Sequence, residues 1–495
     1  MAENYPQPPT QAMPFTGSIT PLNADGKNLL SFPYSNSVSR LNNYEYYERL
    51  FMGEHFSAFN IKVGEDQFNK AFAQLRYVMI NFAGLISKIC ADMLFSEPIT
   101  VKAPDGDQDF VDGLWENNSM DVQCYEAALS NSYFGDALFK LRIGPRRKNK
   151  ESEVIIEDIT PKIYFPAIDQ FNVRAIPDQE ELAWVFRSGN DQYLRKEIHS
   201  PGLIQNKVFL MKDGKIEKEA GLGVLAIPGL EQEEKLKIDD DLLIHTPNWK
   251  TGSRYFGISD YVDMESIFFA INNRMTKTDN ILDKHGDPIL TVPPGILDEK
   301  GQVKKKALGV IEIGEGETGK PEYVVWDAKL DSAFKQIEKL VDFMYLTSEI
   351  SPDILGLGEG KSDSGRALKF KLMRTIAKVA RKKLYFDRSI KQAIFLAQKL
   401  AAAYNIPVNG KKLQGEPVMP EIEWQDGLPI DNSELIDTET KALDAGLTTA
   451  KAAMMRVYGI DEVAAEKMMK EKKDEMAIMM PKMDPKTDLF GKGGK

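Results

Sequence analysis

The sequence predicts an α+β fold with an elongated plan rather than a single globule. Helical periodicity dominates the second half of the chain, whereas residues 137–246 contain short β-rich runs separated by Gly, Pro and charged turns. No helix-sized pattern separates these runs, so we expect a mostly antiparallel sheet and not a doubly wound nucleotide-binding fold. The 495 residues are enough for about three domains, or for one chain of several parts.

The composition is that of an ordinary folded protein. Apolar residues make up 42% and charged residues 28% of the chain, which excludes wholesale disorder. We find no secretion signal and no run near the ~20 apolar residues of a membrane helix. The two cysteines, Cys90 and Cys124, exclude a disulfide framework and are expected to be core thiols. A net charge of −11 argues against a protein that grips nucleic acid over its whole surface, but not against one along which nucleic acid slides.

The first half begins with polar, proline-rich sequence. Residues 1–40 contain six prolines, and we expect them to form a flexible arm. Helices are predicted over residues 72–95, closed by Glu97-Pro98, and over residues 121–133, with Asp121 as N-cap and Gly135 at the end. Strands are then predicted over residues 137–143, 154–159, 182–187, 207–212 and 242–245. Asp213-Gly214 is a typical hairpin turn.

Long helices are predicted in the second half. Apolar residues recur at helical spacing over residues 258–283, 331–349 and 366–404. Between the first two lies a β-rich insert, with strands expected over residues 288–292, 309–313 and 323–326. Methionines crowd the C-terminal part, either for helix packing or as a pliant partner-binding surface.

A glycine-rich loop separates the last two helices. Gly360-Lys361-Ser362 is similar to the end of a phosphate-binding loop, but Leu355 stands where that motif needs glycine, and a helix precedes it instead of a strand. Both differences disfavour nucleotide binding. The loop is then either a flexible connection between helices or a mobile segment exposed for contact.

The start of the long helix carries a basic face. Four cations follow one another at three- and four-residue steps: Lys371, Arg374, Lys378 and Arg381. Unpaired like charges at this spacing cost a few tenths of a kcal/mol, roughly, for each pair, so an acidic group should lie opposite. It would be a carboxylate of a neighbouring subunit or a nucleic-acid phosphate; otherwise the face is simply solvated.

The sequence shows no catalytic constellation. The four histidines are scattered, without metal-ligand spacing, and no pair of carboxylates stands out as a general acid and base. We therefore expect no enzymatic activity, no cofactor and no metal.

Several motifs together resemble the portal proteins of tailed phages, of the siphophage type. They are the segments at 77–98, 252–260 (Gly-Ser-Arg-Tyr-Phe-Gly-Ile-Ser-Asp), 351–358 (Ser-Pro-Asp-Ile-Leu-Gly-Leu-Gly), 364–369 (Ser-Gly-Arg-Ala-Leu-Lys), 424–431 and 445–448. Their order and spacing are more specific than any one of them, and the resemblance spans roughly residues 41–475. Thr448 stands where the family often has Ser, a minor departure.

The resemblance implies a structural protein of the virion. Portal proteins form rings, usually of twelve subunits, at a single capsid vertex, and double-stranded DNA passes through them during packaging and ejection. The implied partners are further copies of the chain, transiently held DNA, the terminase large subunit, major capsid and scaffold proteins, and a head-completion or adaptor protein, with no membrane. The protein would be found in the host cytoplasm during assembly. The alternative is a monomeric capsid adaptor or scaffold-type structural protein.

The resemblance also implies a division of the chain. After the arm come a wing of helices and antiparallel β structure at 41–255, a stem helix at 256–285, a clip at 286–327, a second stem helix at 328–350, a tunnel loop at 351–365, a long wing helix at 366–405, a wing return strand at 406–430, a helical crown at 431–480 and a disordered tail at 481–495.

Three sets of site residues follow. The DNA-facing tunnel loop would be Gly356, Leu357, Gly358, Glu359, Gly360, Lys361, Ser362, Asp363, Ser364 and Gly365. The terminase or adaptor contact on the clip would be Lys304, Lys305, Lys306, Glu315 and Glu317. The basic face at 371–381 would meet a neighbouring subunit or phosphates. Within the loop, we expect Glu359 and Asp363 to repel DNA weakly and Lys361 to offer it a transient contact.

Overall fold

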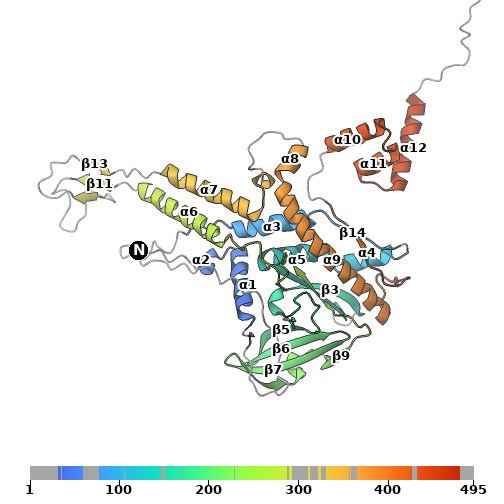
Figure 1. The fold of residues 1–495 in the computed structure, drawn as a ribbon, viewed down its shortest axis with the longest axis horizontal. Helices are drawn as coiled ribbons and strands as arrows, with labels where there is room; N and C mark the ends of the chain where they lie inside the picture. Colours follow the sequence, from blue (N-terminus) through green and yellow to red (C-terminus); the bar gives the residue numbers. More distant parts are fainter. Residues whose placement is uncertain are drawn as a thin grey trace, which may run out of the picture. The chain divides into compact units, whose positions relative to one another are not determined.

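The protein has a mixed α+β fold with antiparallel sheets, which confirms the predicted class (Figure 1). The computed structural model describes residues 32–34, 36–59, 77–104, 106–146, 151–169, 171–227, 229–286, 289–292, 310–312, 322–324, 330–355, 357, 365–425 and 432–479. The chain divides into two compact units. Unit 1 combines Met1–Glu359 with Lys371–Gly427, and unit 2 combines Gly360–Phe370 with Leu428–Lys495.

Unit 1 opens with five helices. They are α1 (Val38–Phe51), α2 (His55–Ala58), α3 (Phe82–Phe95), α4 (Gln108–Asn117) and α5 (Met120–Phe134). Part of the predicted arm is described: Tyr34 and Arg40 are buried, and α1 begins at Val38. The Tyr34 hydroxyl bonds to Glu181 and the Arg40 guanidinium to the carbonyls of Pro161 and Tyr164, so this part of the chain is held against the β region.

The predicted boundaries of two helices shift. The helix expected from residue 72 is described only from Phe82, because the Asn81 side chain accepts from the Gly84 N–H and caps α3 there. Residues 72–76 of that prediction lie outside the described residues. The second helix, α5, is confirmed, although Ser119 and not Asp121 precedes it. It ends as predicted at Gly135, which has a φ of 91°.

Two antiparallel sheets follow, with strand orders β10-β2-β3 and β4-β5-β6-β7-β8, and β9 pairs with β7. Their strands are β2 (Asp136–Gly144), β3 (Glu153–Ile159), β4 (Tyr164–Pro166), β5 (Glu180–Ser188), β6 (Asp191–Ser200), β7 (Leu203–Lys212), β8 (Lys215–Ala220), β9 (Glu233–Lys235) and β10 (Leu243–Pro247). All five predicted strands are confirmed. The Asp213-Gly214 turn is also confirmed: both residues have positive φ, and Lys212 pairs with Lys215 across it.

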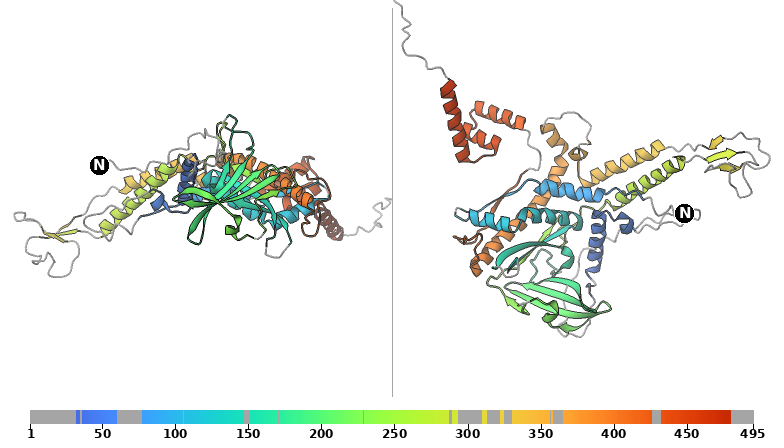
Figure 2. Two further views of the ribbon diagram at one scale, coloured as in Figure 1. Left: turned by 90° about the horizontal axis from the view of Figure 1, so that it is seen from below. Right: turned by 180° about the vertical axis from the view of Figure 1, so that it is seen from behind.

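Two long helices of unit 1 lie side by side, α6 (Glu265–Gly286) and α7 (Leu330–Ser348) (Figures 1 and 2). The prediction that the first helix begins at residue 258 is wrong, since α6 begins at Glu265 and residues 260–264 form turns. Asp263 has a φ of 71°, which a continuous helix excludes, and the buried Asp260 side chain forms ion pairs with Lys378 and Lys382. The predicted insert between the helices is confirmed as β11 (Ile289–Val292), β12 (Val310–Glu312) and β13 (Glu322–Val324), although β11 and β12 pair in parallel.

The longest helical pattern is interrupted once. It gives α8 (Gly365–Lys371) and α9 (Met373–Tyr404), with a turn at Leu372. Later in the chain, β14 (Glu421–Glu423) pairs antiparallel with β1 (Thr100–Lys102). A short 3-10 turn, Pro352–Leu355, precedes the glycine-rich loop.

Aromatic side chains fill the core between the helices of unit 1. Tyr44, Tyr47, Phe134, Tyr261 and Phe268 are buried in one cluster, to which α1, α5 and α6 contribute. Cys90 and Cys124 are both buried, as predicted.

The described part of unit 2 contains most of α8 and then three helices in succession, α10 (Asn432–Asp444), α11 (Ala450–Tyr458) and α12 (Glu462–Met479). Ala465 is the one buried apolar residue among the described residues of this unit. The predicted tail at 481–495 lies outside the described residues. None of the helices in the described part of the chain is long and apolar enough to cross a membrane.

Candidate functional site

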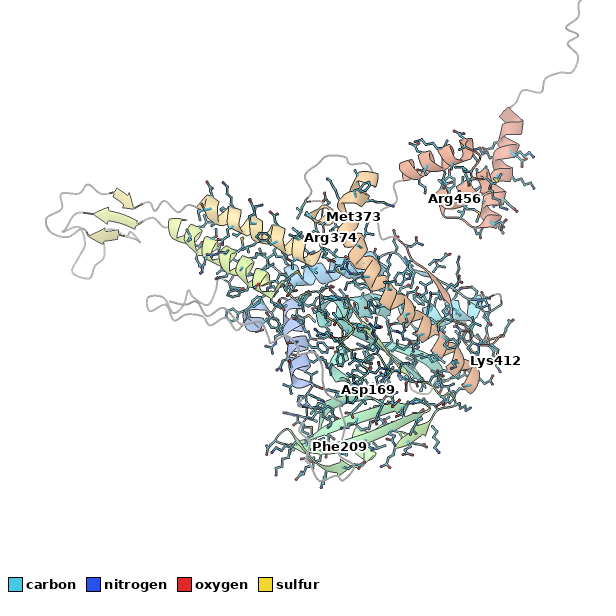
Figure 3. All side chains as sticks on the ribbon, in the orientation of Figure 1. Asp169, Phe209, Met373, Arg374, Lys412 and Arg456 are labelled. Atoms are coloured by element: carbon cyan, nitrogen blue, oxygen red, sulfur yellow. The ribbon has the colours of Figure 1, made fainter. Side chains whose placement is uncertain are left out.

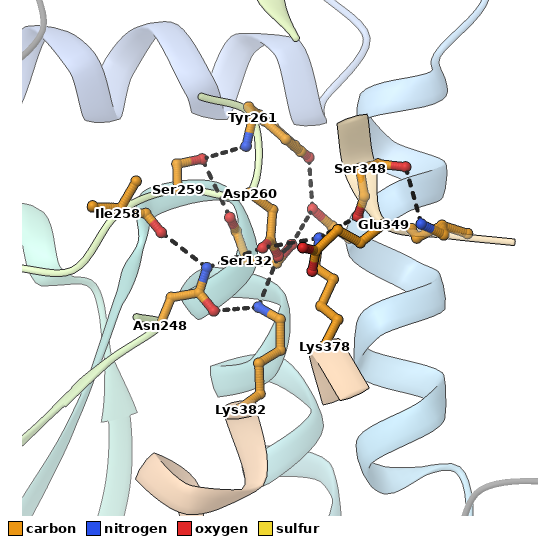
Figure 4. A network of polar contacts seen from close by, with 12 residues as sticks. Ser132, Asn248, Ile258, Ser259, Asp260, Tyr261, Ser348, Glu349, Lys378 and Lys382 are labelled. Atoms are coloured by element: carbon orange, nitrogen blue, oxygen red, sulfur yellow. Dashed lines mark hydrogen bonds and ion pairs between the residues drawn. The ribbon is translucent and has the colours of Figure 1, made fainter. Parts of the chain in front are cut away.

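Three parts of unit 1 meet at a buried ionic network: the segment between β10 and α6, the end of α7, and α9 (Figure 4). Asp260 lies at its centre. One carboxylate oxygen, Oδ1, is 3.1 Å from Lys378 Nζ, and the other, Oδ2, is 2.7 Å from Lys382 Nζ. All three residues are buried.

Local sequence explains why these groups converge. Lys378 and Lys382 are four residues apart, so they project from the same face of α9. The Asp260 N–H donates to the Ser132 carbonyl at 2.9 Å, and the Ser132 hydroxyl donates to Asp260 Oδ2 at 2.7 Å. The Asn248 amide donates to Asp260 Oδ1 at 3.1 Å and its oxygen accepts from Lys382. Every charge in the network therefore has partners.

The electrostatics favour the charged forms. Burial alone would raise the pKa of Asp260, but the ammonium groups of Lys378 and Lys382 outweigh this and hold the pKa well below its usual range. Burial would likewise lower the pKa of Lys378, and the Asp260 carboxylate instead raises it. Asp260 and Lys378 are therefore charged at neutral pH.

A second group of contacts ties the end of α7 to α9. The Lys378 ammonium donates to the Ser348 carbonyl at 2.9 Å, and the Thr375 hydroxyl donates to the Glu349 carbonyl at 3.1 Å. The Ser351 N–H in turn donates to Thr375 Oγ1 at 2.8 Å. We call these three contacts the loop anchor, because they join the two flanks of the glycine-rich loop.

A cavity of about 340 Å³ adjoins the network. Its charged lining residues are Asp260, Asp263, Glu349, Lys378, Arg381 and Lys382. Carboxylates and cations are thus equal in number, so the lining does not select an ionic ligand of either sign. Among the described residues, no group of His, Cys, Asp and Glu side chains could hold a metal ion.

The structure describes little of the predicted tunnel loop. Leu357 is exposed, and Gly365 begins α8. The other members, namely Gly356, Gly358, Glu359, Gly360, Lys361, Ser362, Asp363 and Ser364, lie outside the described residues. So do all the predicted clip contacts: Lys304, Lys305, Lys306, Glu315 and Glu317.

The four cations of the basic face differ in their surroundings. Lys371 lies 3.3 Å from Asp353, Lys378 is buried on Asp260, and Arg381 pairs with Glu349. We expected these cations to face a neighbouring subunit, phosphates or solvent, whereas three of them have acidic partners within the chain. Arg374 is exposed and forms no ion pair with any described residue. The sequence did not predict that Asp260, Asn248 and Lys382 form a buried network. The one available signal was the spacing of Lys378 and Lys382, four residues apart on a helix with an apolar face.

A scan against protein-family models matches residues 227–477 to the family described as phage portal protein, SPP1 Gp6-like. The chain belongs to this family. The portal resemblance is thereby confirmed, and the matched region includes Asp260, both lysines and the loop anchor. A search of curated proteins finds no match.

Portal proteins of this family are structural and non-enzymatic, with a place in the virion and a role in genome packaging. The family also implies an oligomeric ring. The absence of a recognisable catalytic motif from this sequence agrees with that classification.

Proposed function

We propose that copies of this chain form a ring at a single capsid vertex and that double-stranded DNA passes through it during packaging and ejection. The family match carries this proposal, because it extends without a break from β9 into α12. The geometry adds support: α6 and α7 lie side by side, and α7 leads to the loop anchor.

The subdomains of the ring would follow the order of the chain. We assign the wing to residues 41–255, 366–405 and 406–430, the stem to 256–285 and 328–350, the clip to 286–327, the tunnel loop to 351–365 and the crown to 431–480. The confirmed helices α6 and α7 and the β structure between them support the stem and clip assignments.

Charge supports sliding rather than gripping. DNA carries about one charge per 1.7 Å of axis, and a bore lined with lysine and arginine would hold it through counterion release. Each copy of this chain carries −11, so a ring is acidic overall. We propose that Glu359 and Asp363 keep the loop weakly repulsive while Lys361 offers a transient phosphate contact.

Lys361 gives a direct test of the loop assignment. For Lys361→Ala we expect rings to assemble normally and to retain DNA less well during packaging, with Lys361→Arg as the charge-preserving control. A folded monomer that no longer assembles would place the loop in the subunit interface instead.

The basic face and the clip have separate roles in this proposal. Arg374 is exposed and forms no ion pair with a described residue, and it would face a neighbouring subunit or DNA. Lys371 and Arg381, on the same helix face, would lie beside this contact. Residues 304–306, 315 and 317 would contact terminase and the adaptor. A head-completion protein, capsid protein and scaffold would bind elsewhere on the ring.

The experiment that tests the proposed function is the mass of the purified chain by native mass spectrometry, with electron microscopy of the assembled species. A closed ring of about twelve copies with a central hole is expected. The competing interpretation, a monomeric capsid adaptor or scaffold-type protein, predicts a persistent monomer both alone and when co-assembled with capsid proteins.

A further inference from the structure

The N-terminal half of α9 exposes an apolar stripe. Met373 is 60% exposed and Leu384 is 73% exposed, and between them lie the exposed residues Ala377 and Ala380. The steps of four, three and four residues place all four on one line along the helix, which starts at the labelled Met373 in Figure 3. A stripe with two alanines at its centre lets a second helix approach closely.

A row of arginines runs beside this stripe. Arg374, Arg381 and Arg388 are all exposed and recur every seven residues, each on the same side of the apolar line. Arg381 pairs with Glu349, whereas neither Arg374 nor Arg388 forms an ion pair with a described residue. An apolar line flanked by charges at heptad spacing is the pattern of a helix that packs against another helix.

Helix α10 carries the complementary pattern. Ile436 is 47% exposed and Leu443 is 41% exposed, with exposed Thr440 between them and Leu447, 83% exposed, after the helix end. These positions repeat the steps of four, three and four residues. Asp437 and Asp444 are exposed beside this stripe and are also seven residues apart. The stripe on α9 covers eleven helical steps, or roughly 16 Å at 1.5 Å per residue. The part of the second stripe inside α10 covers seven steps, or roughly 10 Å, and Leu447 lies beyond Gly446, whose φ is 70°.

We infer that α10 of one copy packs antiparallel on the N-terminal half of α9 of a second copy. The direction follows from handedness, because each charged row lies on the same side of its stripe when viewed from the helix N-terminus. Two such faces put their charged rows on the same side of the interface only when the helices run in opposite directions. Asp437 and Asp444 then meet the arginine row, and the apolar residues cover each other.

The apolar residues decide between this occupant and DNA. Phosphates would be attracted by the arginines, but Met373 and Leu384 offer them nothing, and Ile436 and Leu443 would stay exposed. A second copy satisfies both the charges and the apolar surface. The inference rests on the proposed ring, which supplies neighbouring copies.

Disulfide trapping tests the contact. The double variant Ala380→Cys/Thr440→Cys places two thiols opposite each other in the antiparallel register, and the native thiols of Cys90 and Cys124 are buried. Oxidation of assembled rings is expected to give a ladder of covalently linked copies on a non-reducing gel. The single variants and Ala380→Cys/Thr438→Cys, whose second thiol lies on the other side of α10, should give none.

The outcomes separate this inference from the proposed function. Closed rings without a ladder, or with a disulfide inside one copy, overturn the helix contact and leave the portal ring intact. A chain that forms no ring at all contradicts the proposed function first.

A charge exchange gives an independent test. Arg374→Asp and Asp444→Arg, which exchange a facing pair in the antiparallel register, should each reduce the fraction of assembled rings about tenfold at low subunit concentration, and their combination should restore most of it. DNA retention lost in the arginine variant, with assembly unchanged in both variants, would assign the arginine row to DNA.

Discussion

At the scale of single residues, Asp260 is a buried carboxylate that joins α9 to the segment before α6. It is the shared partner of two buried lysines from α9 and also accepts from Ser132 and Asn248. Breaking a buried pair by removing one partner costs more than the pair contributes, because an uncompensated charge remains in a poorly solvated place.

Asp260→Asn should therefore lower the free energy of unfolding by about 3–5 kcal/mol, measured by urea denaturation. Because its folded-state pKa is depressed, Asp260 contributes stability that is present above about pH 4 and is lost as the pH falls further. In the Asn variant, the loss of stability with falling pH should be smaller by the contribution of this carboxylate. Asp342→Asn, which breaks an exposed pair with Lys339, should have a much smaller effect, because solvent screens the pair. Equal effects of the two changes would refute the central role of Asp260.

Glu180 predicts a pH dependence of the opposite sign. Burial raises its pKa to about 8, so folding takes up a proton at neutral pH, and stability should fall as the pH rises from about 4.5 to 8. Glu180→Gln keeps an oxygen that accepts from Tyr164 and should be more stable than the wild type at pH 9, by about 1–3 kcal/mol. Urea unfolding at pH 5, 7 and 9 measures this.

The pH slope should be reduced rather than abolished, because burial also raises the pKa of Asp158 to about 8. Glu219→Gln, at an exposed position, is the matched control and should leave the slope unchanged. An unaltered slope in Glu180→Gln would show that this carboxyl ionises normally in the folded protein.

At the scale of elements, the close approach of two glycines sets how α5 meets the segment before α6. A Cβ on Gly257 would lie 2.0 Å from the carbonyl oxygen of Gly135, and that carbonyl accepts from the Asn248 N–H at 2.8 Å. The two backbones touch where any side chain would separate them.

Gly257→Ala is expected to force these backbones apart and to destabilise unit 1 by about 1–3 kcal/mol in urea denaturation. Gly223→Ala is the control, since a Cβ there meets nothing within 4 Å. A Gly257 variant as stable as this control would mean that the segment relaxes freely around the added methyl group.

Sequence patterns predicted elements better than their ends. Periodicity identified five strands of the two sheets (β2, β3, β5, β7 and β10), the helices α6 and α7, and the region of α8 and α9, because alternation and helical spacing are local properties. It did not identify β4, β6, β8 or β9. It missed the true start of α6. The contacts of buried Asp260 and the positive φ of Asp263 keep the preceding residues out of the helix, although their apolar spacing is helical. The ionic network itself was not predictable, because Asp260 and Lys378 are distant in sequence and become partners only through the fold.

At the scale of the whole molecule, the two units differ in how much apolar surface they bury. Unit 1 contains several aromatic clusters, whereas Ala465 is the one buried apolar residue described in unit 2. Local stability follows buried apolar contact, so the two units should open at different rates.

Hydrogen exchange should show this difference in the unassembled chain. Amides of α10–α12 are expected to exchange at least about 100-fold faster than those in the buried part of α9 around Ile390–Ala401, where opening approaches global unfolding. In assembled rings α10 should slow more than α12, because only α10 gains the proposed contact with α9. Equal protection of both units before assembly would contradict the expected hierarchy.

The loop anchor has a consequence for how such a protein can change over generations. Hydrogen bonds of 2.8–3.1 Å already hold Glu349 and Ser351 against Thr375, so the ends of the intervening segment meet whatever its length. Doubling the length of a flexible loop adds only about 0.6 kcal/mol of closure entropy. Insertions and deletions between these residues can therefore accumulate at small thermodynamic cost, which leaves the loop of the proposed DNA path free to diverge while the surrounding framework is inherited unchanged.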